Sequence, residues 1–403
     1  MARTVLGIDR VVRDGLALPG RGRAGVLCNA TTVTGDWEPS AEALARVPGL
    51  RLERIFSPQH GFAAEKQDNM VESADGVHPR LGVPIVSLYG ERREPEPAAL
   101  DGLDILIIDL PDVGTRVYTF LVTALLVLRA CAARGLPAIV LDRPNPIGGA
   151  IEGPVLDNTY QSFVGMVDVP LRHGLTAGEF CAYGCSRLGL PAGTDWLRVV
   201  ALGNWRPSQY YDDSGLPWIM PSPNMPALET AVVYPGQVML EGTNLSEGRG
   251  TTRPFEIFGA PFIDPSSVRE ALRDDADLLA GAHLREVAFE PMIQKHAGQL
   301  VRGFQIHVTD RRRYRPVAET VAILAAIHRV HGDAFAWREP PYEYERERIP
   351  IDLICGTDRV RRAIDAGVPA REIVGAWEDG LAAFRERVGP WTIYLGGQAS
   401  AAR

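Results

Sequence analysis

The sequence predicts an α/β protein in which a doubly wound parallel sheet is followed by a smaller α+β domain. Short, non-alternating runs of Val, Ile and Leu recur through the first half, as in strands that are buried on both faces. Helix-like segments separate these runs, which is the order expected of βαβ units. The length of 403 residues suits two domains, and a proline-rich stretch lies near the middle of the chain.

The elements of the first region follow from these runs. We expect strands at residues 25–28, 52–56, 83–88, 103–110, 138–141 and 197–202. Helices are expected at 40–47, 117–134 and 176–188. The last of these opens with Thr176 and Glu179, a spacing typical of a capping box, in which each side chain binds the other residue's backbone N–H.

Residues 203–235 contain six prolines and should form an irregular connection, because proline fixes φ and cannot continue a helix. Beyond them, we expect helices at 266–279, 317–330 and 373–388, and strands at 284–289 and 303–308. The chain is thus expected to divide into a catalytic domain at 1–232 and a smaller αβ domain at 233–403, which contributes the segment 241–256.

Composition narrows the classes of function. The net charge of −8 and the absence of a basic run argue against nucleic acid as a partner. No apolar run approaches the roughly 20 residues that cross a bilayer, so we expect no membrane span. The first ten residues have no signal-peptide core, and five scattered cysteines fit a reducing compartment, so we expect a cytoplasmic protein.

Neither a cofactor nor a metal is expected. Gly20, Gly22 and Gly25 match the dinucleotide pattern G-x-G-x-x-G, but they precede a predicted strand, whereas that pattern has to follow one and open a helix. Cys181 and Cys185 lie one helical turn apart, but no second pair of ligands has the spacing of a zinc site. Two buried thiols are the simpler interpretation.

Polar side chains follow five of the predicted strands. In an open parallel sheet, ligands bind beyond the carboxyl ends of the strands, where the loops converge. The residues at these positions include Asn29, Gln59, His60, Tyr89, Glu91, Asp112, Arg116, Tyr118, Asp142, Arg143 and Asn145. Amides, carboxylates, arginines and tyrosines without a lysine cluster favour a polyhydroxylated ligand over a nucleoside triphosphate.

The segment 241–256 is a second polar cluster, with three carboxylates, two arginines and three glycines. Glycine lets the backbone approach a ligand closely, and arginine binds a carboxylate through two hydrogen bonds. A pair of neighbouring carboxyl groups is what glycosidic cleavage requires, one protonated and one ionised. The alternative is a turn held together by salt bridges.

Seven motifs occur in a fixed order along the chain. They are Ser-Pro-Gln-His-Gly-Phe at 57–62, Ser-Leu-Tyr-Gly at 87–90, Asp-Leu-Pro-Asp-Val-Gly-Thr-Arg-Val-Tyr at 109–118, Leu-Asp-Arg-Pro-Asn-Pro-Ile-Gly-Gly at 141–149, Glu-Gly-Pro at 152–154, Pro-Asn-Met-Pro at 223–226 and Glu-Gly-Thr-Asn-Leu-Ser-Glu-Gly-Arg-Gly-Thr at 241–251. With these motifs, the chain closely resembles the NamZ family of exo-β-N-acetylmuramidases over nearly its whole length.

The resemblance implies a Rossmann-like N-terminal domain, a smaller αβ C-terminal domain and an active site in the cleft between them. Family members release N-acetylmuramic acid from the non-reducing ends of peptidoglycan fragments, and many are exported. The partner implied for this chain is therefore a peptidoglycan-derived sugar or muropeptide.

One position departs from the family pattern. Many members have a glutamate in place of Gln59, and that glutamate is a candidate catalytic group. An amide cannot exchange a proton at neutral pH as a carboxyl group does. Either another group (Glu241, Glu247, Glu65 or His60) supplies the acid, or the substrate differs, or hydrolysis has been lost.

We assign the catalytic roles to Glu241, Glu247 and His60. The residues expected to bind the sugar are Asn29, Gln59, Arg116, Tyr118, Asp142, Arg143, Asn145, Asn244 and Arg249. Either Arg116 or Arg249 suits the lactyl carboxylate of muramic acid. The alternatives are an amino-sugar-binding protein without catalysis and an exo-hydrolase of another hexosaminide.

Overall fold

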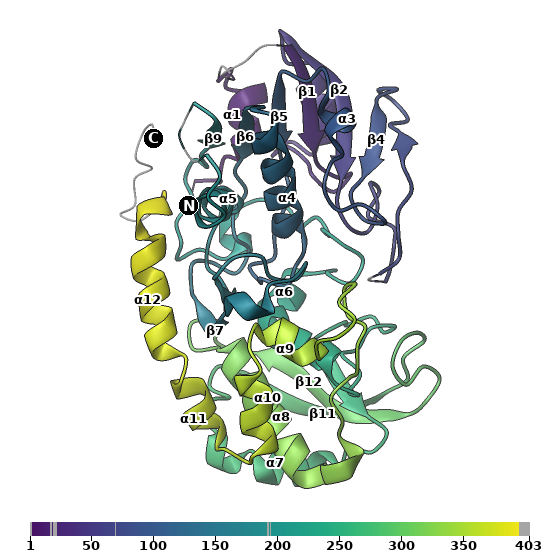
Figure 1. Ribbon diagram of the computed structural model, residues 1–403. Helices are drawn as coiled ribbons and strands as arrows, with labels where there is room; N and C mark the ends of the chain where they lie inside the picture. Colours follow the sequence, from purple (N-terminus) through teal and green to yellow (C-terminus); the bar gives the residue numbers. More distant parts are fainter. Residues whose placement is uncertain are drawn as a thin grey trace.

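A seven-stranded sheet organises the N-terminal part of the protein (Figure 1). The computed structural model describes residues 2–16, 18, 22–68, 70–191, 193 and 195–394. The strand order is β3-β4-β2-β1-β5-β6-β9, and every neighbouring pair is parallel except β3 with β4. The strands are β1 (Gly22–Leu27), β2 (Leu50–Ser57), β3 (Gly76–Val77), β4 (Pro84–Ser87), β5 (Ile105–Ile108), β6 (Ala138–Leu141) and β9 (Leu197–Val200).

Helices cover both faces of this sheet, so each central strand is apolar on both sides. In β5, Leu106 and Ile108 join the core beneath α4 (Phe120–Ala133) and α5 (Ala177–Arg187). Ile105 and Ile107 point to the other face, where α1 (Gly7–Val12) and α2 (Ser40–Ala45) lie. The short helix α3 (Pro97–Leu100) precedes β5. The predicted doubly wound α/β fold is confirmed.

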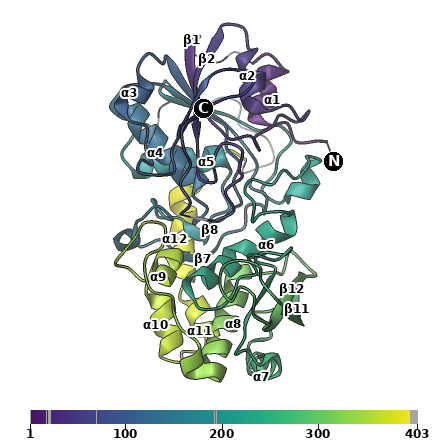
Figure 2. The same ribbon diagram turned by 90° about the vertical axis from the view of Figure 1, so that its right-hand side faces the viewer.

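A three-stranded antiparallel sheet organises the C-terminal part (Figure 2). Its order is β10-β12-β11, from β10 (Ile257–Ala260), β11 (Ala282–Phe289) and β12 (Val301–Val308). The helices here are α6 (Leu228–Gln237), α7 (Pro265–Ala271), α8 (Pro316–His331), α9 (Pro350–Cys355), α10 (Arg359–Asp365), α11 (Ala370–Gly375) and α12 (Glu378–Val388). The apolar core beneath α4 continues without a break into the residues around α6 and α8.

The end of the described chain returns to the N-terminal sheet. Helix α12 runs back beside the N-terminal part (Figure 1), and the residues after it carry the chain toward β6 and β9. The backbone N–H of Ile393 donates to Glu179, 2.7 Å away, and the Tyr394 hydroxyl donates to the buried carboxylate of Asp142. Residues 393–394 therefore belong to the N-terminal core in space, although they lie at the far end of the sequence.

Three local predictions differ from the structure, and three short strands were not predicted. Residues 203–235, expected to be irregular, include the start of α6, which accommodates Pro235 near its end. The helix predicted at 373–388 is two helices, α11 and α12, with a break at Ala376 and Trp377. The helix predicted at 266–279 ends at Ala271. Neither the edge strand β3 nor the hairpin of β7 (Glu152–Val155) and β8 (Pro170–Arg172) was predicted, because these short strands have no apolar run.

The predicted capping box and the predicted pair of buried thiols are confirmed. The Thr176 hydroxyl accepts a hydrogen bond from the Glu179 N–H, and Glu179 accepts one from the Thr176 N–H. Cys181 and Cys185 are buried free thiols. The glycine pattern runs into β1 at Gly22 and does not open a helix, while Gly20 and Arg21 lie outside the described residues. Among the described helices, none combines the length and apolar character that a bilayer crossing requires.

The contact between Tyr394 and Asp142 gives a first prediction. We expect Tyr394→Phe to lower the free energy of unfolding by about 1–2 kcal/mol, because the buried carboxyl group loses a hydrogen-bond donor. Urea titration followed by circular dichroism measures this. A variant as stable as the parent protein would mean that the hydrogen bond between Tyr394 and Asp142 contributes nothing to stability.

Candidate active site

A small buried cavity of about 40 Å³ brings together residues from distant parts of the sequence. Gln59 and His60 come from the loop after β2, and Tyr118 from the loop after β5. Glu241 lies in the 3-10 turn Val238–Gly242, and Arg249 lies in the loop before β10. The rest of the lining is Val117, Thr119, Ser222, Asn224, Met225, Tyr234, Phe255, Tyr342 and Glu343. We call this the carboxylate cavity, after Glu241 and Glu343.

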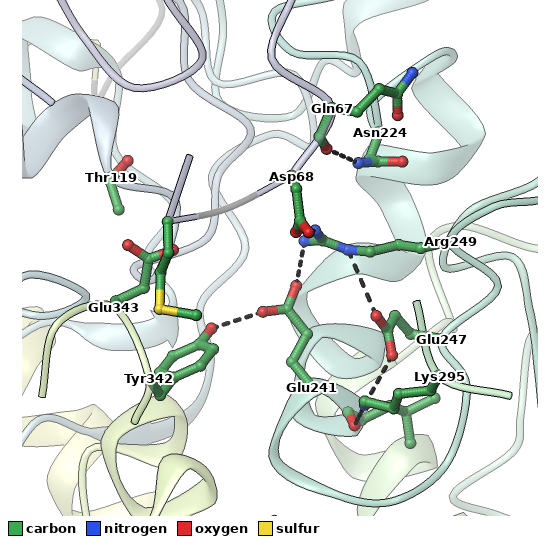
Figure 3. A network of polar contacts seen from close by, with 12 residues as sticks. Gln67, Asp68, Thr119, Asn224, Glu241, Glu247, Arg249, Lys295, Tyr342 and Glu343 are labelled. Carbon is green, nitrogen blue, oxygen red and sulfur yellow. Dashed lines mark hydrogen bonds and ion pairs between the residues drawn. The ribbon is translucent and has the colours of Figure 1, made fainter. Parts of the chain in front are cut away.

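The buried Arg249 guanidinium connects the acidic groups on one side of the cavity (Figure 3). Its Nη2 lies 2.6 Å from Glu241, its Nε lies 3.5 Å from Glu247, and its Nη1 lies 3.7 Å from the half-exposed carboxylate of Asp68. Burial opposes the charge on Arg249, but Glu241 and Glu247 hold its pKa above the ordinary value. The other oxygen of Glu241 accepts a hydrogen bond of 2.8 Å from the Tyr342 hydroxyl.

Glu247 is held by a second cation. The Lys295 ammonium donates to Glu247 at 2.9 Å and to the backbone carbonyls of Leu240 and Leu245. Burial alone would raise the pKa of Glu247, but Lys295 and Arg249 together bring it below the ordinary value. Glu247 therefore pairs with Arg249 and Lys295 and does not itself line the carboxylate cavity.

Glu343 is a buried carboxyl group without a cation at hydrogen-bond distance in the described structure. One oxygen accepts a hydrogen bond of 2.8 Å from the Tyr89 hydroxyl, and the other accepts one of 3.2 Å from the Gln59 amide. The amide oxygen of Gln59 accepts from the Thr119 hydroxyl. Burial raises the pKa of Glu343, and the nearby charge of Glu241 raises it further, against the effect of the two hydrogen bonds.

His60 is neutral at neutral pH. Burial lowers its pKa to about 4, the contact with the Lys66 carbonyl counteracts this, and the charge of Arg249 adds to the lowering. Its Nδ1 lies 2.7 Å from that carbonyl, so Nδ1 carries the proton and Nε2 is left as an acceptor. The backbone at His60, Glu343 and Tyr344 has φ values of 75°, 44° and 68°. Such left-handed conformations are strained for non-glycine residues and are concentrated at functional sites.

The structure brings five of the predicted site residues to the carboxylate cavity and places the others elsewhere. The five are Gln59, His60, Tyr118, Glu241 and Arg249. Asn29 lines a larger neighbouring cavity. Arg116, Asp142, Arg143, Asn145 and Asn244 line neither of these cavities.

Those five side chains bind other parts of the fold. Arg116 donates to the backbone carbonyls of Pro154, Val169 and Ile354, and burial lowers its pKa to about 10. Asp142 accepts from the N–H of Gly178, and burial raises its pKa to about 7. The other three hold chain turns and loops together: Arg143 pairs with Asp109, Asn145 binds Leu175 and Ile147, and Asn244 binds Ala334 and Ala336.

Sequence reasoning missed Glu343 and Tyr342, and it noted Tyr89 after a predicted strand without assigning it to the site. Tyr342 and Glu343 follow two prolines in the loop before α9, more than 280 residues from Gln59 along the chain. Alternation of tyrosine and glutamate at 342–345 was the available signal, but it does not reveal which carboxyl group is buried. In the described residues, no group of three or more His, Cys, Asp or Glu side chains could hold a metal ion.

The low pKa of His60 gives a prediction about stability and pH. In the unfolded chain His60 takes up a proton below its ordinary value of about 6.5, whereas in the folded protein it does so only near 4. Stability is therefore lost as the pH falls between these values. We expect the free energy of unfolding to drop by about 2 kcal/mol more in the parent protein than in His60→Asn between pH 7 and pH 5.

Denaturant titrations at the two pH values measure this difference, with His283→Asn, at an exposed position, as the control. If the parent protein and His60→Asn lose equal free energies of unfolding, folding does not lower the pKa of His60.

Comparisons with known proteins identify the family. The family model for the N-terminal part of exo-β-N-acetylmuramidase NamZ matches residues 24–229, and the model for its C-terminal part matches residues 232–394. The peptidoglycan β-N-acetylmuramidase NamZ of Bacillus subtilis is 36% identical over 390 residues, which cover 96% of this chain and 91% of that protein.

Two solved structures share the fold. Both are DUF1343 family proteins of Bacteroides fragilis, and each aligns with 98% of this chain. The first has a TM-score of 0.85 at 26% identity and is covered completely, and the second has a TM-score of 0.75 at 27% identity and is covered to 99%. With two family models covering most of its length and a relative of this identity, the chain belongs to the NamZ family of exo-β-N-acetylmuramidases.

Proposed function

We propose that the protein is an exo-acting β-N-acetylmuramidase that releases terminal N-acetylmuramic acid from peptidoglycan fragments, with Glu343 as its general acid. Family membership supports the reaction. The observation that carries the assignment is a pair of carboxyl groups in opposite surroundings on one cavity: Glu241 beside Arg249, and Glu343 without a cation. When two neighbouring carboxyl groups have such different surroundings, the one that keeps its proton can act as the acid and the ionised one as the base or nucleophile.

Glu343 suits the acid because burial and Glu241 favour its protonated form. A general acid has to hold a proton near the working pH and pass it to the leaving oxygen as the glycosidic bond breaks. Gln59 keeps Glu343 in place through its amide N–H. The proposed proton donor, Glu343, thus lies 3.2 Å from the amide of Gln59, the position at which many family members have a glutamate.

Glu241 suits the second carboxylate. Its two oxygens accept hydrogen bonds from Arg249 and Tyr342, as an ionised carboxylate does. On this proposal Glu247 acts through Arg249, as a positioning group. His60, with Nε2 as an acceptor, would bind a sugar hydroxyl.

Arg249 is the proposed partner of the lactyl carboxylate of muramic acid. Arg116 is the other arginine of the sequence prediction, but its guanidinium already serves three backbone carbonyls. At Arg249, Nη1 faces Asp68 at 3.7 Å, and this carboxylate is 40% exposed. A substrate carboxylate can take the place of Asp68 without disturbing Glu241 or Glu247 on the other guanidinium nitrogens.

The carboxylate cavity of about 40 Å³ has room for a few water molecules and not for a sugar ring. Binding therefore requires the lining segments to separate. Two polar contacts join the segment with Gln67 and Asp68 to the surroundings of Arg249: Asn224 donates to the Gln67 carbonyl at 2.7 Å, and Asp68 faces Arg249 (Figure 3). Sugar hydroxyl and carboxylate groups can replace such contacts.

The cysteines favour a reducing compartment for this reaction. All five are buried free thiols, and burial raises the pKa of each. A protein without structural disulfides suits the cytoplasm, and we propose that it acts there on recycled wall fragments.

The acid assignment predicts a difference between two substrates. We expect Glu343→Gln to lower kcat about 10²- to 10⁴-fold on the disaccharide in which N-acetylmuramic acid is linked to N-acetylglucosamine. With 4-nitrophenyl β-N-acetylmuraminide the loss should be much smaller, because nitrophenolate leaves without a proton. Steady-state kinetics on the two substrates measures the difference.

Glu345→Gln is the matched control, because Glu345 lies two residues away and pairs with Arg348 outside the cavity. Equal losses on both substrates would contradict an acid role for Glu343. A parent protein that binds muropeptide and cleaves neither substrate would favour the binding-protein alternative, and cleavage of the corresponding glucosaminide would favour another hexosaminidase.

The proposed role of Arg249 predicts an effect of Asp68. We expect Asp68→Asn to lower KM for the muraminide by about two- to fivefold, because it removes a carboxylate that competes for the guanidinium. Asp36→Asn, which removes an exposed carboxylate beside Arg3, is the control. An unchanged or higher KM for Asp68→Asn would show that the substrate does not replace Asp68.

A further inference from the structure

The residue proposed as the general acid lies in the middle of a tight turn. The N–H of Tyr342 donates to the carbonyl of Glu345, and the N–H of Glu345 donates to the carbonyl of Tyr342, each at 2.9 Å. Glu343 and Tyr344 are the two residues between them, with φ values of 44° and 68°. A two-residue turn with positive φ at both positions is of type I′, for which asparagine and glycine are the usual residues.

The conformation of this turn places groups on both sides of the carboxylate cavity. The Tyr342 hydroxyl donates to Glu241, and Glu343 accepts a hydrogen bond from Tyr89. A turn that relaxed to negative φ would move the Glu343 carboxyl group relative to Glu241. Because glutamate and tyrosine are strained at positive φ, contacts outside the turn have to hold it.

The ring of Tyr344 makes such contacts. Its centroid lies 5.7 Å from that of Tyr89, edge to face, and the guanidinium carbon of Arg93 lies 3.5 Å from the Tyr344 centroid. Arg93 also lies 5.5 Å from the centroid of Phe163. A cation over an aromatic face is attracted by the π electrons of the ring. Arg93, from the loop after β4, therefore joins rings from two other segments of the chain.

Arg93 differs in its contacts from the arginine beside it. Arg92 pairs with the carboxylates of Asp75 and Glu96. Arg93 forms no ion pair among the described residues, and its Nε has no hydrogen-bond partner there. The position of Arg93 over Tyr344 is therefore not the result of a salt bridge to a neighbouring carboxylate.

We propose that Arg93 is a positioning residue for the general acid: through the ring of Tyr344, it keeps the turn in the conformation that presents Glu343 to the carboxylate cavity. This inference rests on the proposed function, in which Glu343 donates the proton. Arg93 does not line the carboxylate cavity. Its effect on the reaction passes through Tyr344 and the backbone of the turn.

The first test compares two leaving groups. Arg93→Met removes the charge, and we expect kcat on the disaccharide to fall about three- to thirtyfold, the range that a cation–ring contact represents. On the nitrophenyl muraminide, kcat should change less than about twofold, because nitrophenolate leaves without a proton. Retained cleavage of that substrate also shows that the variant is folded. Arg93→Lys, which keeps a cation, should lose less than Arg93→Met, and Arg92→Met is the matched control.

The pH profile gives a second measurement. Burial raises the pKa of Glu343, and the hydrogen bond from Tyr89 opposes this. The charge of Glu241 raises the pKa further, and that of Arg249 opposes it. A looser turn exposes the carboxyl group, so its pKa moves down toward the ordinary value. An acid works only while it is protonated, so the alkaline limb of kcat/KM on the disaccharide should move to lower pH in Arg93→Met. A general loss of structure would lower the rate without moving this limb.

A double-mutant cycle tests the route through Tyr344. If Arg93 acts through this ring, Arg93→Met combined with Tyr344→Leu should lose no more kcat on the disaccharide than Tyr344→Leu alone. Losses that multiply would overturn the proposal, as would equal losses on the two substrates in Arg93→Met.

The Glu343→Gln variant separates this proposal from the proposed function. Equal losses on the two substrates in Glu343→Gln would contradict the acid role itself. A large loss in Glu343→Gln on the disaccharide only, with an unchanged Arg93→Met, would overturn the positioning role of Arg93 and leave the acid role intact.

Discussion

The buried guanidinium of Arg249 is the interaction on which the rest of the site depends. Glu241, Glu247 and Glu343 are all buried within one small region, and carboxylates so placed repel one another and lose hydration. Arg249 binds two of them, and Lys295 binds Glu247 from the other side. Without this cation, Glu241 would be an unpaired buried charge, a change that typically costs about 3–5 kcal/mol. The positions of the three carboxyl groups around the cavity therefore depend on which of them Arg249 and Lys295 bind.

That sharing leaves the three carboxyl groups chemically different. Glu247 has two cations, Glu241 has one, and Glu343 has hydrogen-bond donors only. A glycosidase needs such a difference, because one carboxyl group has to keep a proton that the other has lost. Gln59 contributes through being uncharged: its amide donates to Glu343, where a glutamate would add a further negative charge.

The fold explains how residues so far apart in sequence come together. Parallel strands of the doubly wound sheet end at one edge, where the loops after β2 and β5 supply Gln59, His60 and Tyr118. The C-terminal part is joined to the sheet by a continuous apolar core through α6 and α8, and its loops supply the carboxyl groups. Arg116 reinforces this junction, because it donates hydrogen bonds to the carbonyl of Val169 in the N-terminal part and to that of Ile354 in the C-terminal part.

The sequence by itself determined the sheet and the family. Buried strands such as β5 and β6 show as apolar runs because both of their faces are covered, and the capping box at Thr176 is a local pattern. Motifs with a fixed order identified the NamZ family. Local patterns also placed Glu241, Arg249 and His60 among the candidates, because these residues belong to polar segments rich in glycine or proline.

Only the tertiary structure decided which polar residues face the cavity and in what state. Asp142 and Arg143 follow a strand just as His60 does, but their side chains bind Gly178 and Asp109 in the surrounding fold. The alternation of tyrosine and glutamate at 342–345 does not single out Glu343, because its importance comes from burial and from Gln59 and Tyr89, residues more than 250 positions away along the chain. Burial and the identity of neighbouring charges set protonation, and both are properties of the packed chain that no local pattern records.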